Sequence, residues 1–348
     1  MKLSIVIPVY NCREYLCECV DSILTQKAEF DYEIILIDDG SLDRSGEICD
    51  SLAQENDCVK SFHKKNGGAA SARNLGIEKS AGDYLMFIDG DDTLADGVLK
   101  HISEVISANR CDMIVYGMSL DYYRKGNLSN KVLLSCQFNG LKQKSEMFCN
   151  FKRFFDNNAL SSACNKVFQS AVIEECNLRF VEGMTLYEDL NFVINYLAHS
   201  DKIFFIPEPY YHYRIDADSQ NLHSRVSNIE KLQSNLELLL SSMIALNLQT
   251  ESAEMLNVGA DLYVFLLDLN LLYSSGKINE QKESVQAYCN SSVFAKVLEA
   301  GASLHPRYKE LITQIRSNQF NVLQREYGKR KLKLKVRRKI KRIIQKVR

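Results

Sequence analysis

Residues 84–92 read YLMFIDGDD, a short apolar run followed by three carboxylates within four positions. The run predicts a strand over 84–89. Asp89, Asp91 and Asp92 would then crowd the end of that strand. This crowding is unfavourable unless a metal ion, a basic side chain or a hydrogen-bonding ligand neutralises part of the charge.

Taken alone, the acidic motif has two interpretations. Carboxylates in a D-x-D spacing are hard oxygen ligands that can hold Mg²⁺ or Mn²⁺ against a diphosphate. Acidic residues also close strands for structural reasons, and Asp92 could simply cap a helix that starts near Leu94. The surrounding sequence is needed to choose between them.

The first hundred residues alternate strands and helices around this motif. The expected strands are 3–9, 32–38, 58–63 and 84–89, and the expected helices are 13–26, 43–56, 68–80 and 94–108. This order predicts an α/β fold with a mostly parallel, helix-covered sheet. Ligands of such sheets bind beyond the carboxyl ends of the strands, so the polar segments found there should line one crevice. These segments are Asn11, DDGSLD (38–43), NGGAASARN (66–74) and IDGDD (88–92).

The rest of the chain is less regular. We expect a fifth strand over 111–118, an irregular hairpin over 119–140, a mixed segment to about 200, and a strand, a proline turn and an aromatic strand over 202–214. From about residue 225 the pattern is helical. This change of period predicts three parts: a sheet domain over 1–222, a helical C-terminal region over 223–328 and a tail over 329–348.

The composition is that of a globular protein, with 46% hydrophobic and 25% charged residues. Eleven cysteines without a CxxC pair indicate reduced thiols in a cytosol rather than a disulfide scaffold. Pro8 and Arg13 interrupt the apolar start, which is expected to be a strand and not a signal peptide. No stretch approaches the ~18 to 20 apolar residues of a membrane span, so any membrane contact is expected to be peripheral.

The last twenty residues, KRKLKLKVRRKIKRIIQKVR, contain 12 Lys or Arg and no acid, whereas the rest of the chain carries 31 basic and 44 acidic residues. Apolar residues recur in this tail at spacings of three and four, as on one face of a helix. A basic amphipathic helix of this kind is suited to an anionic membrane surface. A solvated tail and a nucleic-acid arm are the alternatives, and the regular apolar stripe argues against nucleic acid.

Several motifs occur in the order and approximate spacing of the family 2 glycosyltransferases with a GT-A fold. They are SIVIPVYN, LIDDGSLD, NGGAASARNLG, FIDGDD, CNKVF and YEDLNF. The chain resembles this family over about residues 3–220, and within it the bacterial enzymes of capsular polysaccharide, exopolysaccharide and lipopolysaccharide synthesis. The resemblance implies a Rossmann-like GT-A sheet, a nucleotide-sugar donor, and Mn²⁺ or Mg²⁺ at the acidic motif.

The resemblance also implies a donor site along the first half of the sheet. Asp39 matches the residue that hydrogen-bonds the nucleotide base, and Val9 and Asn11 match the wall beside it. Arg73 matches a residue near the base and phosphates. Asp89 matches the ribose-side or metal-side carboxylate.

The remaining matches concern the metal and the diphosphate. Asp91 looks like the direct metal ligand. Residues 210–221 correspond to the family segment that closes over the diphosphate. In this segment Arg214 is a candidate phosphate contact. His212 is a candidate third metal ligand or phosphate donor.

Glycosyl transfer needs a base that takes the proton of the acceptor hydroxyl. Glu188 and Asp189 match the family's acidic pair, of which Asp189 is the expected base. Neighbours on a helix diverge by about 100°, so Glu188 is left to orient a substrate hydroxyl or to form an ion pair. Direct displacement inverts the anomeric centre, and we therefore expect an inverting enzyme.

The chain departs from the family pattern at two points. It has no Trp, so Cys164 stands where an aromatic residue often precedes the NK pair. This leaves the acceptor-side wall undefined. The Q-x-x-R-W element of processive synthases is also missing, which favours the transfer of one sugar per encounter.

We therefore expect a metal-dependent glycosyltransferase that moves one sugar from a nucleotide donor, with UDP as the expected nucleotide, to a surface glycan. The basic tail favours a lipid-linked acceptor at the cytoplasmic face of a membrane. The alternative is a non-catalytic nucleotide-sugar or glycan-binding protein recruited by its tail. A nucleotidyltransferase would need a glycine-rich phosphate loop after the first strand, and VYNCREY (9–15) contains no glycine.

Overall fold

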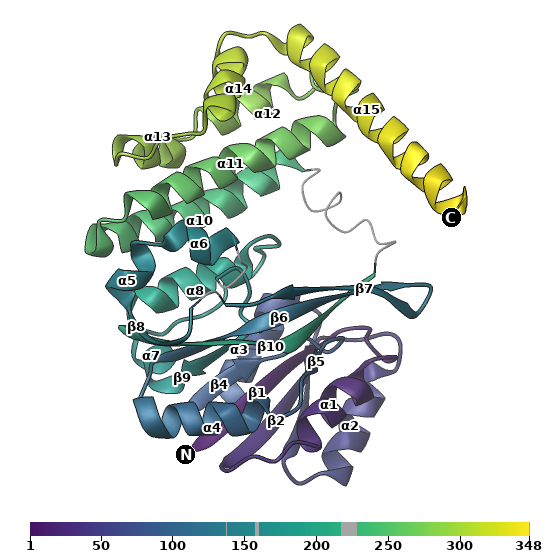
Figure 1. Ribbon diagram of the computed structural model, residues 1–348, viewed down its shortest axis with the longest axis vertical. Coiled ribbons are helices and arrows are strands. Elements are labelled where there is room, and N and C mark those ends of the chain that lie inside the picture. The colour runs from purple at the N-terminus through teal and green to yellow at the C-terminus, as the bar shows by residue number, and fades with distance from the viewer. Residues whose placement is uncertain (137, 157–159, 217–227, 348) are drawn as a thin grey trace. The chain divides into compact units, whose positions relative to one another are not determined.

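The computed structural model describes residues 1–136, 138–156, 160–216 and 228–347, without the side chains of residues 249 and 335–347. The chain divides into two compact units, Met1–Ser219 and Gln220–Arg348. Figure 1 shows the first in purple to teal and the second in green to yellow. The domain boundary expected near residue 222 lies outside the described residues.

The N-terminal unit is built on a ten-stranded sheet in its described part, with the order β3-β2-β1-β4-β9-β6-β10-β5 and with β7 beside β6 and β8 beside β10. The strands are β1 Lys2–Val9, β2 Asp31–Asp38, β3 Val59–His63, β4 Tyr84–Phe87, β5 Thr93–Leu94, β6 Met113–Arg124, β7 Asn127–Leu134, β8 Gly140–Gln143, β9 Lys166–Gln169 and β10 Lys202–Asp216. Strands β1 to β4, β6 and β10 run in one direction, and the other strands run opposite. The predicted α/β fold is confirmed, and its sheet is mixed.

Helices flank this sheet in Figure 1. They are α1 Leu16–Leu24, α2 Ser45–Glu55, α3 Ala69–Lys79, α4 Val98–Asn109, α5 Lys144–Phe148, α6 Phe151–Asp156, α7 Ser170–Glu175 and α8 Glu188–Ala198. The buried residues of α1 are Leu16, Cys19, Val20 and Ile23, which is the spacing of one helix face. This pattern explains why α1 packs against the sheet.

The parallel half of the sheet brings the predicted loops to one edge. In the strand register Val9 lies beside Asp38, and Asp38 lies beside His63. Helix α3 packs closely on β1 because Gly76 has no side chain, since a Cβ there would lie only 2.1 Å from Cγ1 of Val6. The carboxyl ends of β1, β2 and β3 are therefore neighbours.

Two local predictions need correction. Residues 202–214 form one continuous strand, β10, in which the register against β6 shifts between Ile206 and Tyr211. This irregularity accommodates the two prolines, which have no amide hydrogen for the ladder. The helix expected from Leu94 begins at Val98, because Thr93–Leu94 pairs with β10 as β5. The irregular hairpin expected over 119–140 is confirmed, since β6 continues to Arg124 and pairs with β7 with a register shift between Tyr122 and Tyr123.

The C-terminal unit is helical in its described part. Its helices are α10 Ile229–Thr250, α11 Ala253–Tyr273, α12 Lys282–Cys289, α13 Ser292–Glu299, α14 Pro306–Arg316 and α15 Phe320–Val347. By length and composition α11 could cross a membrane, which corrects the expectation that no segment approaches a span. Most of α11 is nevertheless buried inside the protein, as is usual for a core helix.

Helix α15 includes the basic tail. It begins at Phe320, so the expected start of the tail at residue 329 lies inside a continuous helix. Arg330 Nη1 donates to Asp268 Oδ1 at 2.7 Å, and Lys331 Nζ donates to the carbonyl of Tyr273 at 2.7 Å. The first residues of the tail are thus held on α11.

Candidate active site

Arg73 of α3 joins two carboxylates that lie far apart in the sequence. Its Nη2 donates to Asp89 Oδ1 at 2.7 Å, and its Nη1 donates to Asp189 Oδ1 at 2.8 Å. Arg73 is 3% exposed, and its guanidinium lies 5.3 Å from the centre of the Phe180 ring. The structure therefore places Arg73 between the acidic motif and the expected base.

Glu188 and Asp189 are the first two residues of α8. Tyr187, which precedes them, has a left-handed backbone with φ of 62°. Asp189 Oδ2 accepts a hydrogen bond from the amide of Ala163 at 3.0 Å, so both carboxylate oxygens are held in place. A carboxylate offers about four acceptor positions, which leaves Asp189 able to accept a further proton donor.

Aromatic packing fixes α8 relative to β4. Phe192 of α8 stacks on Phe180 with ring centres 4.1 Å apart, and Phe87 of β4 meets Phe180 edge-on at 5.2 Å. Contacts of this kind add to the apolar burial of the rings. The distance between the end of β4 and the start of α8 is consequently set by the core.

Asp92 ties the acidic loop to β10. It is 1% exposed, and it accepts hydrogen bonds from Tyr211 OH at 2.6 Å and from the amide of Arg214 at 2.7 Å. Burial, followed by the charges of Asp89 and Asp91, raises the pKa of Asp92 well above its usual value. The capping role considered for Asp92 is not found, because α4 begins only at Val98 after Gly97.

Asp91 lies at the surface of the same loop. The surrounding protein, and then the charge of Asp89, raise the pKa of the Asp91 carboxyl to about 6, and Arg214 offsets this only in part. Negative charge that the protein leaves partly uncompensated fits a divalent cation held by Asp91 and Asp89.

The structure brings Arg214 to the acidic loop. Its Nε donates to the carbonyl of Asp91 at 3.0 Å and its Nη2 donates to Glu18 at 2.8 Å. His212 contacts Asp121 instead of the acidic loop, since its Nδ1 lies 3.1 Å from Asp121 Oδ2. No group of three or more His, Cys, Asp or Glu side chains suited to a metal ion is found among the described residues, so His212 is not gathered with Asp89 and Asp91.

Asp39 connects the loops that follow β2 and β3. It is 2% exposed. Its Oδ1 accepts hydrogen bonds from Lys64 Nζ at 2.6 Å and from the amide of Gly67 at 2.9 Å, and its Oδ2 accepts from the amide of Gly68 at 2.7 Å. A base contact from Asp39 would use the acceptor position that these three donors leave.

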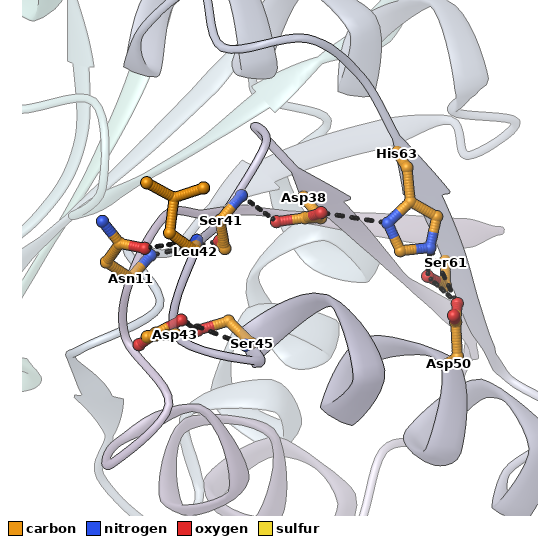
Figure 2. Close-up of polar contacts among 9 residues, drawn as sticks. All are labelled: Asn11, Asp38, Ser41, Leu42, Asp43, Ser45, Asp50, Ser61 and His63. Atoms are coloured by element: carbon orange, nitrogen blue, oxygen red, sulfur yellow. Dashed lines mark hydrogen bonds and ion pairs between the residues drawn. The ribbon is translucent and has the colours of Figure 1, made fainter.

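Asn11 and Val9 form hydrogen bonds to the loop that follows β2. Asn11 Oδ1 accepts a hydrogen bond from the main-chain amide of Leu42 at 2.8 Å. The main-chain amide of Asn11 donates to Ser41 Oγ at 3.1 Å, as Figure 2 shows. The carbonyl of Val9 accepts from the amide of Asp39 at 2.9 Å. We name residues 39–44 the nucleotide loop, after the nucleotide contact expected of Asp39.

Sequence reasoning missed several residues that shape the site. The amide of Ala163 carries no sequence signal, since any residue but proline supplies one. Tyr211 OH accepts a hydrogen bond from the amide of Asp89 at 3.1 Å and donates to Asp92. The alternation in YYHYR could have indicated that Tyr211 faces inward.

The sheet and its flanking helices define a GT-A type of fold, with an acidic loop after β4 and an acidic start of α8. Residues 4–174 match the model of glycosyl transferase family 2. Through this segment the chain belongs to that family, as its motifs had indicated.

Two bacterial glycosyltransferases are among the named relatives. The uncharacterized glycosyltransferase EpsJ of Bacillus subtilis is 30% identical over 217 residues, which are 62% of this chain and 62% of EpsJ. The poly(ribitol-phosphate) beta-glucosyltransferase of Bacillus spizizenii is 25% identical over 326 residues, which are 91% of this chain and 49% of that protein. The chain thus spans less than two thirds of both relatives.

A solved structure covers both units. The crystal structure of S. aureus TarS 1–349 superposes with a TM-score of 0.70 at 17% identity, covering 94% of this chain and 92% of that one. Its complex with UDP-GlcNAc gives a TM-score of 0.64 at 18% identity. At this identity the likeness shows a shared fold.

Proposed function

We propose that this protein is a metal-dependent, inverting glycosyltransferase that moves one sugar from a UDP-linked donor to a bacterial surface glycan. The bridge from Asp89 through Arg73 to Asp189 carries the proposal. It puts a carboxylate suited to proton transfer next to the end of β4, where the diphosphate of a donor would bind. Family membership and the UDP-GlcNAc complex of TarS support the donor class.

In this proposal Asp189 takes the proton of the acceptor hydroxyl as that oxygen attacks the anomeric carbon. Arg73 and the amide of Ala163 hold the two oxygens of Asp189, so the base needs no reorganisation when the acceptor arrives. Glu188, beside it, orients an acceptor or donor hydroxyl. Because the acceptor oxygen displaces the diphosphate in one step, the configuration of the anomeric centre is inverted.

On the donor side the nucleotide loop, with Val9, Asn11 and Asp39, receives the base of the nucleotide. Arg214 lies at the carbonyl of Asp91 and presents its guanidinium to the phosphates. Buried Arg73, which donates to Asp89 and Asp189, contributes positive charge to the site. Asp91 and Asp89 would hold Mn²⁺ or Mg²⁺, whose charge would neutralise the departing diphosphate.

The acceptor proposal rests on the relatives and on α15. A poly(ribitol-phosphate) beta-glucosyltransferase that covers 91% of this chain supports a surface polymer as acceptor. The helix that carries the basic tail is held on α11 at Arg330 and Lys331. We place its remaining residues on the anionic inner face of the cytoplasmic membrane, where a lipid-linked acceptor would be presented.

The proposal is tested by incubating the full chain with UDP-glucose, UDP-galactose and UDP-GlcNAc, with Mn²⁺ and with membrane extracts as acceptor. Release of UDP with incorporation of one sugar is expected from one donor. The anomeric configuration of the product then reports inversion. UDP binding without release or transfer under any condition would favour the non-catalytic binding protein instead.

A further inference from the structure

His63, at the end of β3, lies between two carboxylates from different elements (Figure 2). Its Nδ1 is 3.0 Å from Asp38 Oδ2, and its Nε2 is 2.8 Å from Asp50 Oδ1. Asp38 ends β2 and Asp50 belongs to α2. One imidazole ring therefore connects the strand that leads into the nucleotide loop with the helix that follows it.

This geometry selects one protonation state of the ring. A carboxylate only accepts hydrogen bonds, so both ring nitrogens must donate to satisfy both partners. Only the imidazolium has two N–H groups, whereas either neutral tautomer loses one bond. The two carboxylates accordingly raise the pKa of His63 above its usual value.

The other polar groups around the ring do not change this conclusion. Ser61 Oγ of β3 lies 3.3 Å from Nε2 and 2.8 Å from Asp50 Oδ1. The thiol of Cys49 in α2 is kept neutral, because burial and the charge of Asp38 raise its pKa. The adjacent Lys64 is engaged by Asp39 at 2.6 Å.

Asp38 passes the constraint on to the nucleotide loop. Its Oδ1 accepts a hydrogen bond from the amide of Ser41 at 3.0 Å, while its Oδ2 faces His63. Ser41 Oγ in turn accepts from the amide of Asn11. A Cβ on Gly46 would lie 2.9 Å from Asp38 Oδ2 and 3.4 Å from Cε1 of His63, so the start of α2 closes over this pair. The loop is thus fixed from both ends.

We propose that protonated His63 is a positioning residue that holds the nucleotide loop in its binding conformation, so that nucleotide affinity falls when the ring becomes neutral. This inference rests on the proposed function, because it assumes that residues 39–44 bind a nucleotide. A site that is only partly in its competent conformation binds with an affinity reduced by that fraction. The effect is complete below the usual His value of about 6.5 and is lost as the pH rises through the higher value of the folded protein.

The test is a calorimetric titration of the full chain with UDP and Mg²⁺ between pH 6.5 and 9, for the wild type and for His63→Gln. Glutamine can donate from one end only and does not titrate. The quantity of interest is the ratio of the two dissociation constants, since the ionisation of UDP and of other groups affects both proteins alike. We expect His63→Gln to bind about fivefold more weakly at pH 6.5 and within about twofold of the wild type at pH 9.

Two further variants complete the design. His199→Gln changes an exposed histidine at the far end of α8 and should give a ratio near one at every pH. Asp50→Asn leaves His63 with one carboxylate, so the loss of affinity should occur at lower pH than in the wild type. Asp50 is half exposed, which makes this variant suitable if His63→Gln fails to fold.

A ratio for His63→Gln that is the same at pH 6.5 and pH 9 would overturn the proposal, because a purely structural histidine gives that result. Equal affinity of the variant and the wild type would also overturn it. Failure of the wild type to bind UDP at any pH is a different outcome, since it contradicts the proposed function itself.

Discussion

Arg73 Nη1 and Asp189 Oδ1 lie 2.8 Å apart, although 116 positions separate the two residues in the sequence. The same guanidinium reaches Asp89 at 2.7 Å. Because Arg73 is buried, this pairing fixes the start of α8 against the end of β4. The geometry of the site depends on that contact.

Replacing Asp189 by Asn should stop transfer while sparing the donor site. The amide cannot take the acceptor proton, and loss of a general base lowers the rate by about 10² to 10⁴. UDP affinity, measured by calorimetry, should stay within about threefold of the wild type. An Asp189→Asn protein with full transferase activity would remove Asp189 as the base.

Replacing Arg73 by Gln should destabilise the fold as well as the site. It leaves Asp89 and Asp189 without their shared cation, and breaking a buried pair from one side costs about 3 to 5 kcal/mol. Urea unfolding measures this loss. Glu78→Gln, at an exposed position near the end of the same helix, serves as control and should change the free energy of unfolding by less than about 0.5 kcal/mol. Equal stability of the two variants would show that the Arg73 bridge does not matter.

Metal-dependent nucleotide binding should weaken at acid pH. The pKa of Asp91 is raised to about 6, so its carboxyl is protonated below that pH and only the ionised form binds a cation. UDP affinity with Mg²⁺ should rise between pH 5 and 7, by up to about tenfold per unit below pH 6. In Asp91→Asn the UDP affinity should lack this part of the rise with pH. If the UDP affinities of the wild type and of the variant were equal at every pH, Asp91 would not be a metal ligand.

The basic tail can be shortened without disturbing its docked part. Deletion of residues 335–348 keeps Arg330 and Lys331, which bond Asp268 and the carbonyl of Tyr273, and removes eight of the 12 basic residues of the tail. Each basic residue near an anionic surface contributes about 1 kcal/mol. Sedimentation with phosphatidylserine vesicles should therefore show a large loss of binding, with UDP affinity unchanged. Undiminished vesicle binding would place the membrane contact elsewhere.

Much of the first half of the fold could be predicted because its signals are local. The strands β1, β2 and β3 and the helices between them follow from apolar runs and turn residues close in sequence. Strand β5 has two residues and exists only because it pairs with β10. The sequence of β10 predicts two strands, because prolines are normally found at strand ends. The bulge that accommodates them is a tertiary feature.

The site shows the same limit. Asp189 and Asp91 could be proposed from motifs. The pairing of Arg73 with Asp189 could not, because it joins α3 to α8 over 116 positions of sequence. His63 is a lone histidine at a strand end and has no motif. Its significance becomes visible only when Asp38 and Asp50 are seen on either side of the ring (Figure 2).

The central claim is that the acidic loop after β4 binds the diphosphate of a nucleotide sugar through a metal ion. The most direct measurement is calorimetric titration of the wild type and of Asp91→Asn with UDP and other nucleoside diphosphates, first with Mn²⁺ and then with EDTA. We predict that the wild type binds UDP and that EDTA and Asp91→Asn both weaken this binding strongly. Absence of nucleotide binding under every condition, or binding that neither change affects, would contradict the account.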